Sequence, residues 1–182
     1  ILKEPTFPGK ELEIVKNTNL QQFLVNSTKV DFLAHRALVK ALYGENHPCG
    51  RLVKEEDYKN LQTDILHSFY NNYYHSSNCT IYIAGKITQE CLKRMTKLFG
   101  EESFGENNHL ITPAIHTPSS CADKQIFIER SDALQSAIRM GMLTIDRCHP
   151  DFLKLRVLIT LFGGYFGSRL MANIRENKGY TY

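Results

Sequence analysis

Apolar residues recur at helical spacing through most of the first half of the chain. This spacing predicts a first helix from about residue 10 to 24 and a second from about residue 28 to 43, which Gly44 ends. Helical periodicity resumes from about residue 55 to 74, as a short turn followed by a longer helix. Residues 45–51 have the composition of a loop, so they are expected to connect these helical parts.

The second half alternates between segments typical of strands and segments typical of helices. Segments rich in β-branched and aromatic residues predict strands at residues 79–84, 125–129 and 135–146. Helices are predicted from Thr88 to Phe99, from residues 149–151 to Phe162, and from Ser168 to Asn177. Residues 100–124 are rich in Gly, Asn, Pro and Ser, which is typical of a long connection.

This order of elements predicts an α+β fold, a two-layer sandwich with a mostly antiparallel sheet and helices packed on one face. Residues 1–75 are expected to form a helical part that completes a preceding repeat and links it to the next. Residues 76–182 are expected to form the sandwich part and to end within their domain. Because the sequence opens without Met and stops in an expected strand at residues 180–182, we expect the domain to be truncated at both ends.

Composition narrows the classes of function. The 182 residues are 42% hydrophobic and 23% charged, with a net charge of +3, which is typical of a globular protein. The charges alternate in sign and no apolar run is long enough for a membrane span, so neither nucleic acid nor membrane is an expected partner. The five cysteines are widely spaced without C-x-x-C, which argues against a disulfide framework and favours a cytoplasmic protein, with a periplasmic one as the alternative.

The histidines do not form a zinc motif. A zinc site needs three or four converging ligands, often two His one helical turn apart, and the chain contains no H-x-x-E-H. The seven histidines are scattered: His35, His47, His67, His75, His109, His116 and His149. The glycine-rich run at residues 163–168 lacks the Gly-Lys-Ser/Thr ending of a phosphate loop, so it is interpreted as a flexible entry to the last helix with Ser168 as N-cap.

Three segments resemble, in the right order, segments of the pitrilysin/insulinase family of zinc peptidases. They are the His-Pro loop at residues 42–51, the strand at 78–85 with its Thr-capped helix, and the stretch 166–182. The resemblance implies a metallohydrolase-like clamshell, in which a partner domain or subunit carries zinc on H-x-x-E-H. A second, related domain then completes the substrate chamber and binds the peptide, and this chain resembles that second domain.

The resemblance also implies two substrate-binding residues, Arg175 and Tyr182, which have the family's spacing. A guanidinium and a phenol hydroxyl can both donate to a peptide carbonyl as it becomes an oxyanion. Tyr180 faces the same side of the expected strand and is the rival for the hydroxyl role. An Arg in the last turn of a helix is also favoured by the helix dipole alone, and a Tyr in a strand is ordinary.

One position departs from the family's catalytic pattern. Where the family has a third zinc ligand, a Glu, this sequence has Gln22, with Gln21 beside it, and an amide binds zinc less well than a carboxylate. We therefore expect an inactive domain with no metal of its own and zinc in the partner. Two alternatives stay open: a structural scaffold without a proteolytic role, and an independent peptidase whose parent chain carries H-x-x-E-H before Ile1.

Overall fold

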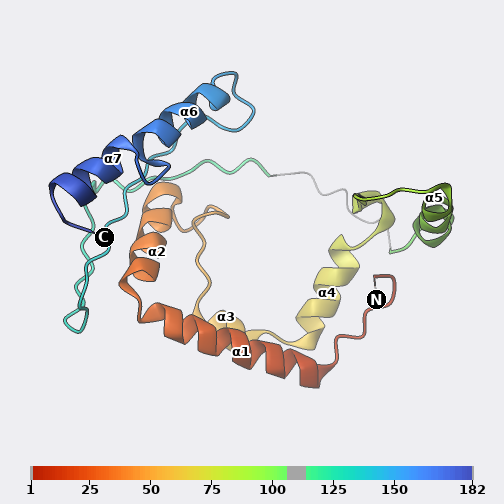
Figure 1. The fold of residues 1–182 in the computed structure, drawn as a ribbon. Helices are drawn as coiled ribbons and strands as arrows, with labels where there is room; N and C mark the ends of the chain where they lie inside the picture. The colour runs from red at the N-terminus through yellow and green to blue at the C-terminus, as the bar shows by residue number, and fades with distance from the viewer. Residues whose placement is uncertain (1, 106–113, 182) are drawn as a thin grey trace. The chain divides into compact units, whose positions relative to one another are not determined.

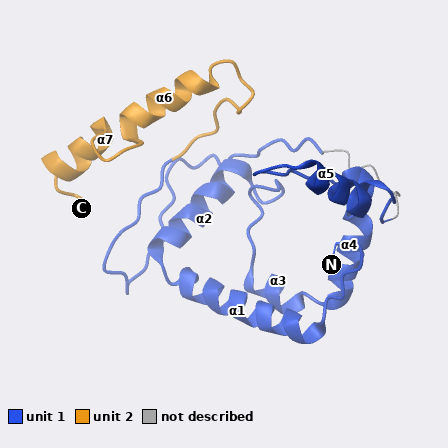
Figure 2. Cartoon of the chain, turned by 45° about the vertical axis from the view of Figure 1, so that its right-hand side comes forward, with its two compact units in different colours: residues 1–140 blue, residues 141–182 orange. Residues whose placement is uncertain are grey.

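A computed structural model describes residues 2–105 and 114–181 of the chain. It divides into two compact units, Ile1–Met140 and Gly141–Tyr182 (Figure 2). The expected division into residues 1–75 and 76–182 stays a prediction. Two compact units do not show whether the first helices complete a preceding repeat.

The helices of the first unit confirm the periodicity of the sequence (Figure 1). Those of its N-terminal part are α1 (Gly9–Ser27), α2 (Val30–Tyr43), α3 (Glu55–Asn60) and α4 (Thr63–Tyr73). They are followed by η1 (Ser76–Asn78), α5 (Gln89–Met95) and the π-helical η2 (Thr96–Gly100). The predicted cap of α5 is confirmed, since the Thr88 hydroxyl accepts from the Cys91 N–H at 3.2 Å. Within the parts of the chain just given, no helix is both long and apolar enough to span a membrane.

Aromatic contacts join the first three helices. The Phe23 ring of α1 lies 6.1 Å from the Phe32 ring of α2 and 5.6 Å from the Tyr58 ring of α3. The guanidinium of Arg36 lies over both phenylalanines, 5.5 and 5.3 Å from the ring centroids. Arg36 Nη2 also donates to the Val53 carbonyl at 2.8 Å, which ties the segment before α3 to α2. These contacts fix how α1, α2 and α3 lie together.

Burial is low throughout the residues that the structure describes. No hydrophobic residue among them is buried, and the buried polar residues are His75, 2% exposed, and Ser168, 0% exposed. A conventional hydrophobic core would contain several fully buried apolar side chains. Individual ring, cation and hydrogen-bond contacts therefore carry the organisation of each unit.

A segment distant in sequence caps the end of α2. Gly44 adopts φ +79° and donates its N–H to the Lys40 carbonyl at 2.8 Å, which ends the helix as predicted. Residues 119–121, which we call the strap, donate to the last carbonyls of α2: the Ser119 N–H to Tyr43 at 3.0 Å, the Ser120 hydroxyl to Leu42 at 3.0 Å, and the Cys121 N–H to Ala41 at 2.7 Å. The strap thus satisfies acceptors that every helix end leaves open.

The N-terminal segment is anchored on α4. The Tyr70 hydroxyl lies 2.8 Å from the Leu2 carbonyl and 2.9 Å from that of Lys3. The Phe7 ring stands edge-on to the His67 ring at 5.0 Å, with a left-handed backbone at φ +38°. A bulky residue takes this backbone only where its surroundings hold it, so the contacts with α4 fix the path of the segment.

The prediction of an α+β sandwich with a mostly antiparallel sheet is wrong. Residues 2–105 and 114–181 contain no strand, and hence no sheet for the helices to cover. The segments expected as strands have no regular secondary structure and form no ladder: residues 79–84, 125–129 and 135–146. Their side chains are open to solvent, for example Tyr82 at 90% and Phe127 at 94% exposure. Composition predicts extended backbone, whereas a strand exists only through hydrogen bonds to a neighbour.

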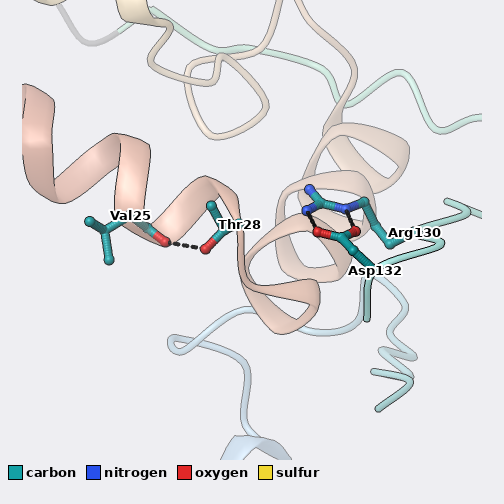
Figure 3. A network of polar contacts seen from close by, with 4 residues as sticks. All are labelled: Val25, Thr28, Arg130 and Asp132. Atoms are coloured by element: carbon teal, nitrogen blue, oxygen red, sulfur yellow. Dashed lines mark hydrogen bonds and ion pairs between the residues drawn. The ribbon is translucent and has the colours of Figure 1, made fainter. Parts of the chain in front are cut away.

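A bidentate ion pair closes the turn between two of these segments (Figure 3). The Ala133 N–H donates to the Arg130 carbonyl at 3.2 Å. Arg130 Nε and Nη2 donate to the two carboxylate oxygens of Asp132 at 3.0 and 2.9 Å. Hydrogen bonding from Arg130 is the main cause that lowers the pKa of the Asp132 carboxyl. The same figure shows Thr28 Oγ1 donating to the Val25 carbonyl at 2.9 Å, at the end of α1.

We expect the pH dependence of this turn to follow the lowered pKa of Asp132. A carboxyl whose pKa is lower in the folded state stabilises the turn above its unfolded pKa of about 4. That stability is lost as the pH falls through the folded pKa. In a carboxyl-carbon NMR titration, Arg130→Gln should raise the Asp132 midpoint, whereas Arg51→Gln should leave it in place. An unchanged midpoint in Arg130→Gln would contradict the assignment.

A second prediction concerns the loop after α2, where Gly50 is packed against backbone. A Cβ atom at Gly50 would lie 1.9 Å from the Gly44 carbonyl oxygen and 3.0 Å from Tyr43 Cβ. Gly50→Ala should therefore lower the free energy of unfolding by roughly 1–3 kcal/mol, the usual cost of overpacking. The matched control is Gly9→Ala, because no atom lies within 4 Å of its Cβ position. Equal urea midpoints for the two variants would show that the loop is not closed in this way.

Candidate functional site

The second unit begins with a turn built from its own side chains. The Asp146 carboxylate accepts from the Cys148 N–H at 2.7 Å, and His149 Nδ1 accepts from the Asp151 N–H at 3.1 Å. Such bonds from a side chain to a nearby amide favour turns over continuing regular structure. The turn leads directly into α6 (Phe152–Gly163), which confirms the helix start predicted at residues 149–151.

The glycine-rich segment at residues 163–167 is a tight turn between two helices. The Gly164 N–H donates to the Thr160 carbonyl at 3.0 Å and ends α6. A Cβ atom at Gly164 would lie 2.6 Å from Thr160 Cα, so the close approach requires glycine. The Ser168 N–H then donates to the Tyr165 carbonyl at 3.0 Å, which places Phe166 and Gly167 at the centre of a four-residue turn.

The last helix starts where the sequence predicts, but it is wider than an α-helix. It begins as α7 (Arg169–Met171) and continues as the π-helical η3 (Ala172–Asn177). Ser168 occupies the N-cap through its carbonyl, which accepts from the Ala172 N–H at 2.9 Å. Its buried hydroxyl has no hydrogen-bond partner among the described residues. Single π turns are rare and frequently occur at functional sites.

Arg175 lies in this π turn and is half-buried. Its guanidinium carbon lies 4.2 Å from the centroid of the Phe166 ring, in the glycine-rich turn nine residues earlier. Within the described part of the chain, no carboxylate or carbonyl pairs with this guanidinium. Its N–H donors are therefore open to a ligand, while its central carbon lies over an aromatic ring. This contact was not predicted from the sequence, where its signal was an aromatic residue among glycines.

The chain reverses direction just after Arg175. Gly179 adopts φ +64° and donates its N–H to the Arg175 carbonyl at 3.2 Å, and the Tyr180 N–H donates to the Ile174 carbonyl at 3.0 Å. Tyr180 is 77% exposed, with Lys178 Nζ 5.9 Å from its ring centroid. Tyr182 lies outside the described residues. The backbone of Tyr180 thus lies beside the helical turn that carries Arg175. Which of the two tyrosines supplies the hydroxyl stays a prediction.

The residues expected at the lost zinc position do not fit a metal. Gln21 and Gln22 are exposed on α1, and Gln22 Nε2 donates to Asn26 Oδ1 at 3.2 Å. In residues 2–105 and 114–181, no three His, Cys, Asp or Glu side chains are placed to hold a metal ion. The His47 and His116 rings meet edge to face, with their centroids 5.8 Å apart. His109 lies outside the described residues. The described residues therefore offer no set of ligands for a metal ion.

Comparisons with known proteins agree with one another. The family described as the peptidase M16 inactive domain matches residues 60–182. An uncharacterized zinc protease, YmxG, from Bacillus subtilis is 29% identical over 97% of this chain and 42% of its own length. A protein from Helicobacter pylori called the non-peptidase homolog YmxG is 26% identical over 100% of this chain and 42% of its own length. The chain therefore spans less than half of either relative.

A solved structure shows the same fold. It is the crystal structure of a peptidase M16 inactive domain from Pseudomonas fluorescens, which matches with a TM-score of 0.68 at 24% identity. The match covers 100% of this chain and 43% of that chain.

Proposed function

We infer the function of this chain from its family. The chain belongs to the peptidase M16 inactive domains, which confirms the resemblance to the pitrilysin/insulinase family. We propose that it forms part of the substrate chamber of a zinc metallopeptidase and binds the peptide through Arg175. Zinc and its H-x-x-E-H motif then belong to a catalytic partner domain or subunit. A tyrosine hydroxyl, from Tyr182 or its rival Tyr180, completes the contact.

The observation that carries this proposal is the state of the Arg175 guanidinium. It lies in a π turn, is half-buried, and has no ion-pair or hydrogen-bond partner among the described residues. A planar guanidinium with free N–H donors is suited to bind a carbonyl oxygen, and its bonds strengthen as charge develops on that oxygen. The hydrogen bond from the Tyr180 N–H to the Ile174 carbonyl keeps the segment after Gly179 beside this turn, which supports a tyrosine as second donor.

A scaffold without proteolytic role is the second candidate. It is favoured by the name of the Helicobacter pylori relative, a non-peptidase homolog. A scaffold would bind no extended peptide near Arg175, so peptide binding separates the two functions. The third possibility, an independent peptidase, would need a zinc motif that this sequence does not contain and a carboxylate where Gln22 stands.

The first prediction from this proposal concerns Arg175 in the assembled enzyme. Arg175→Ala should lower turnover of a peptide by roughly a hundredfold, as expected for the loss of a donor to a developing oxyanion. Arg175→Lys should recover part of the loss, because it keeps the charge without the planar fork. The control is Arg156→Ala on the exposed side of α6, which should change nothing. Unchanged turnover in Arg175→Ala would contradict the proposed site and favour the scaffold.

The second prediction separates the two tyrosines. If the Tyr182 hydroxyl donates to the peptide, Tyr182→Phe should lower turnover on the order of a hundredfold, while Tyr180→Phe leaves it unchanged. The substitution removes one hydroxyl and keeps the ring. The reverse result would assign the role to Tyr180. Two fully active variants would remove tyrosine from the site and leave Arg175 as its donor.

A further inference from the structure

We propose that Phe166 is a positioning residue, which holds the guanidinium of Arg175 in the orientation that a peptide carbonyl requires. This inference rests on the proposed role of Arg175 in peptide binding. It adds a second residue to the site, one that touches the arginine and not the peptide.

The contact is the closest of its kind in the described part of the chain. The Arg175 guanidinium carbon lies 4.2 Å from the Phe166 ring centroid, against 5.3 and 5.5 Å for Arg36 over its two rings. Lys178 lies 5.9 Å from the Tyr180 ring. Cation–π attraction acts within about 6 Å and is strongest where the cation is close to the ring face.

Burial does not explain an aromatic residue at position 166. The Phe166 side chain is 65% exposed, so most of its surface faces water instead of a core. Exposed large apolar side chains are common on proteins, and exposure alone would carry no conclusion. The feature that distinguishes Phe166 is that a cation covers one of its faces.

The turn that carries Phe166 has little freedom. Gly164 approaches Thr160 too closely for any side chain, and a Cβ at Gly163 would meet Leu170 Cδ2 at 3.3 Å. At its other end the turn is closed by the hydrogen bond from Ser168, whose side chain is fully buried. The ring therefore projects from a fixed backbone, which a positioning residue needs.

Holding the guanidinium over an aromatic ring has a defined chemical consequence. The N–H bonds of arginine lie in the plane of the guanidinium and point away from its faces. With its central carbon over the Phe166 ring, the guanidinium keeps N–H donors available to an acceptor such as the carbonyl of an extended peptide. Arg175 then loses less rotamer freedom when the peptide binds, so the contact favours binding through preorganisation.

The experiment compares Phe166→Leu with Phe166→Tyr in the full-length protein assembled with its catalytic partner. Leucine keeps an apolar side chain without a π face, whereas tyrosine keeps the face. With a quenched fluorescent peptide that the wild-type assembly cleaves, Phe166→Leu should lower kcat/KM by about threefold, the scale of an exposed cation–π contact. Phe166→Tyr should restore it. The control, Tyr165→Leu, removes a neighbouring exposed aromatic that does not touch Arg175 and should have no effect.

Two further measurements separate positioning from a merely structural role. In the Arg175→Ala background, Phe166→Leu should have no additional effect, because the two residues act through one contact. The ring current of residue 166 should shift the Arg175 Nε–H proton resonance upfield in the wild type and in Phe166→Tyr. That shift should disappear in Phe166→Leu and persist in Tyr165→Leu.

The outcomes distinguish this inference from the function on which it rests. If Arg175→Ala lowers turnover but Phe166→Leu does not, the positioning role is overturned and the peptide site stands. A Phe166→Leu effect that tyrosine fails to rescue, or that persists without Arg175, also overturns it. If Arg175→Ala leaves turnover unchanged, the proposed function fails and the positioning role falls with it.

Discussion

The first three helices depend on one cation held over two aromatic rings. Arg36 on α2 lies over Phe23 and Phe32 and also binds the carbonyl of Val53, so a single side chain links three stretches of the chain. Each such contact is worth only about 0.5–1 kcal/mol at an exposed site. Because no hydrophobic residue is buried among the described residues, these individual contacts hold the helices together in place of a hydrophobic core. Few positions therefore carry much of the organisation.

The second unit also contains an arginine over an aromatic ring, but there the arginine is a candidate for binding. There the cation is Arg175 and the ring is Phe166, and both come from a stretch that a glycine turn folds back on itself. In the first unit the arginine is also engaged by a carbonyl, so its contact is structural. In the second the guanidinium has no partner among the described residues other than the ring. The difference in hydrogen bonding, more than the type of residue, separates a structural arginine from a candidate binding residue.

The helices and their ends could be predicted from the sequence, because their signals are local. The 3.6-residue period, the Thr88 cap and the Gly44 stop each act within a few residues. The predicted sheet failed because pairing is not local: residues 79–84 have strand composition, and nothing in it says whether a neighbour is present. Arg175 was found through a resemblance of motifs. Its contact with Phe166 was not, because it depends on the turn at Gly164.

The strap bears on the order in which the first unit folds. The bond from Ser120 to Leu42 joins residues 78 apart in sequence, whereas each turn of α2 closes over four. Bringing such distant segments together costs chain entropy before any bond is gained, so contacts of this range form later than helices do. We therefore expect the last carbonyls of α2 to be solvated when the helix first forms and to accept the hydrogen bonds of the strap in a later step. The hydrogen bonds between the strap and the end of α2 would then mark a late stage in the folding of the first unit.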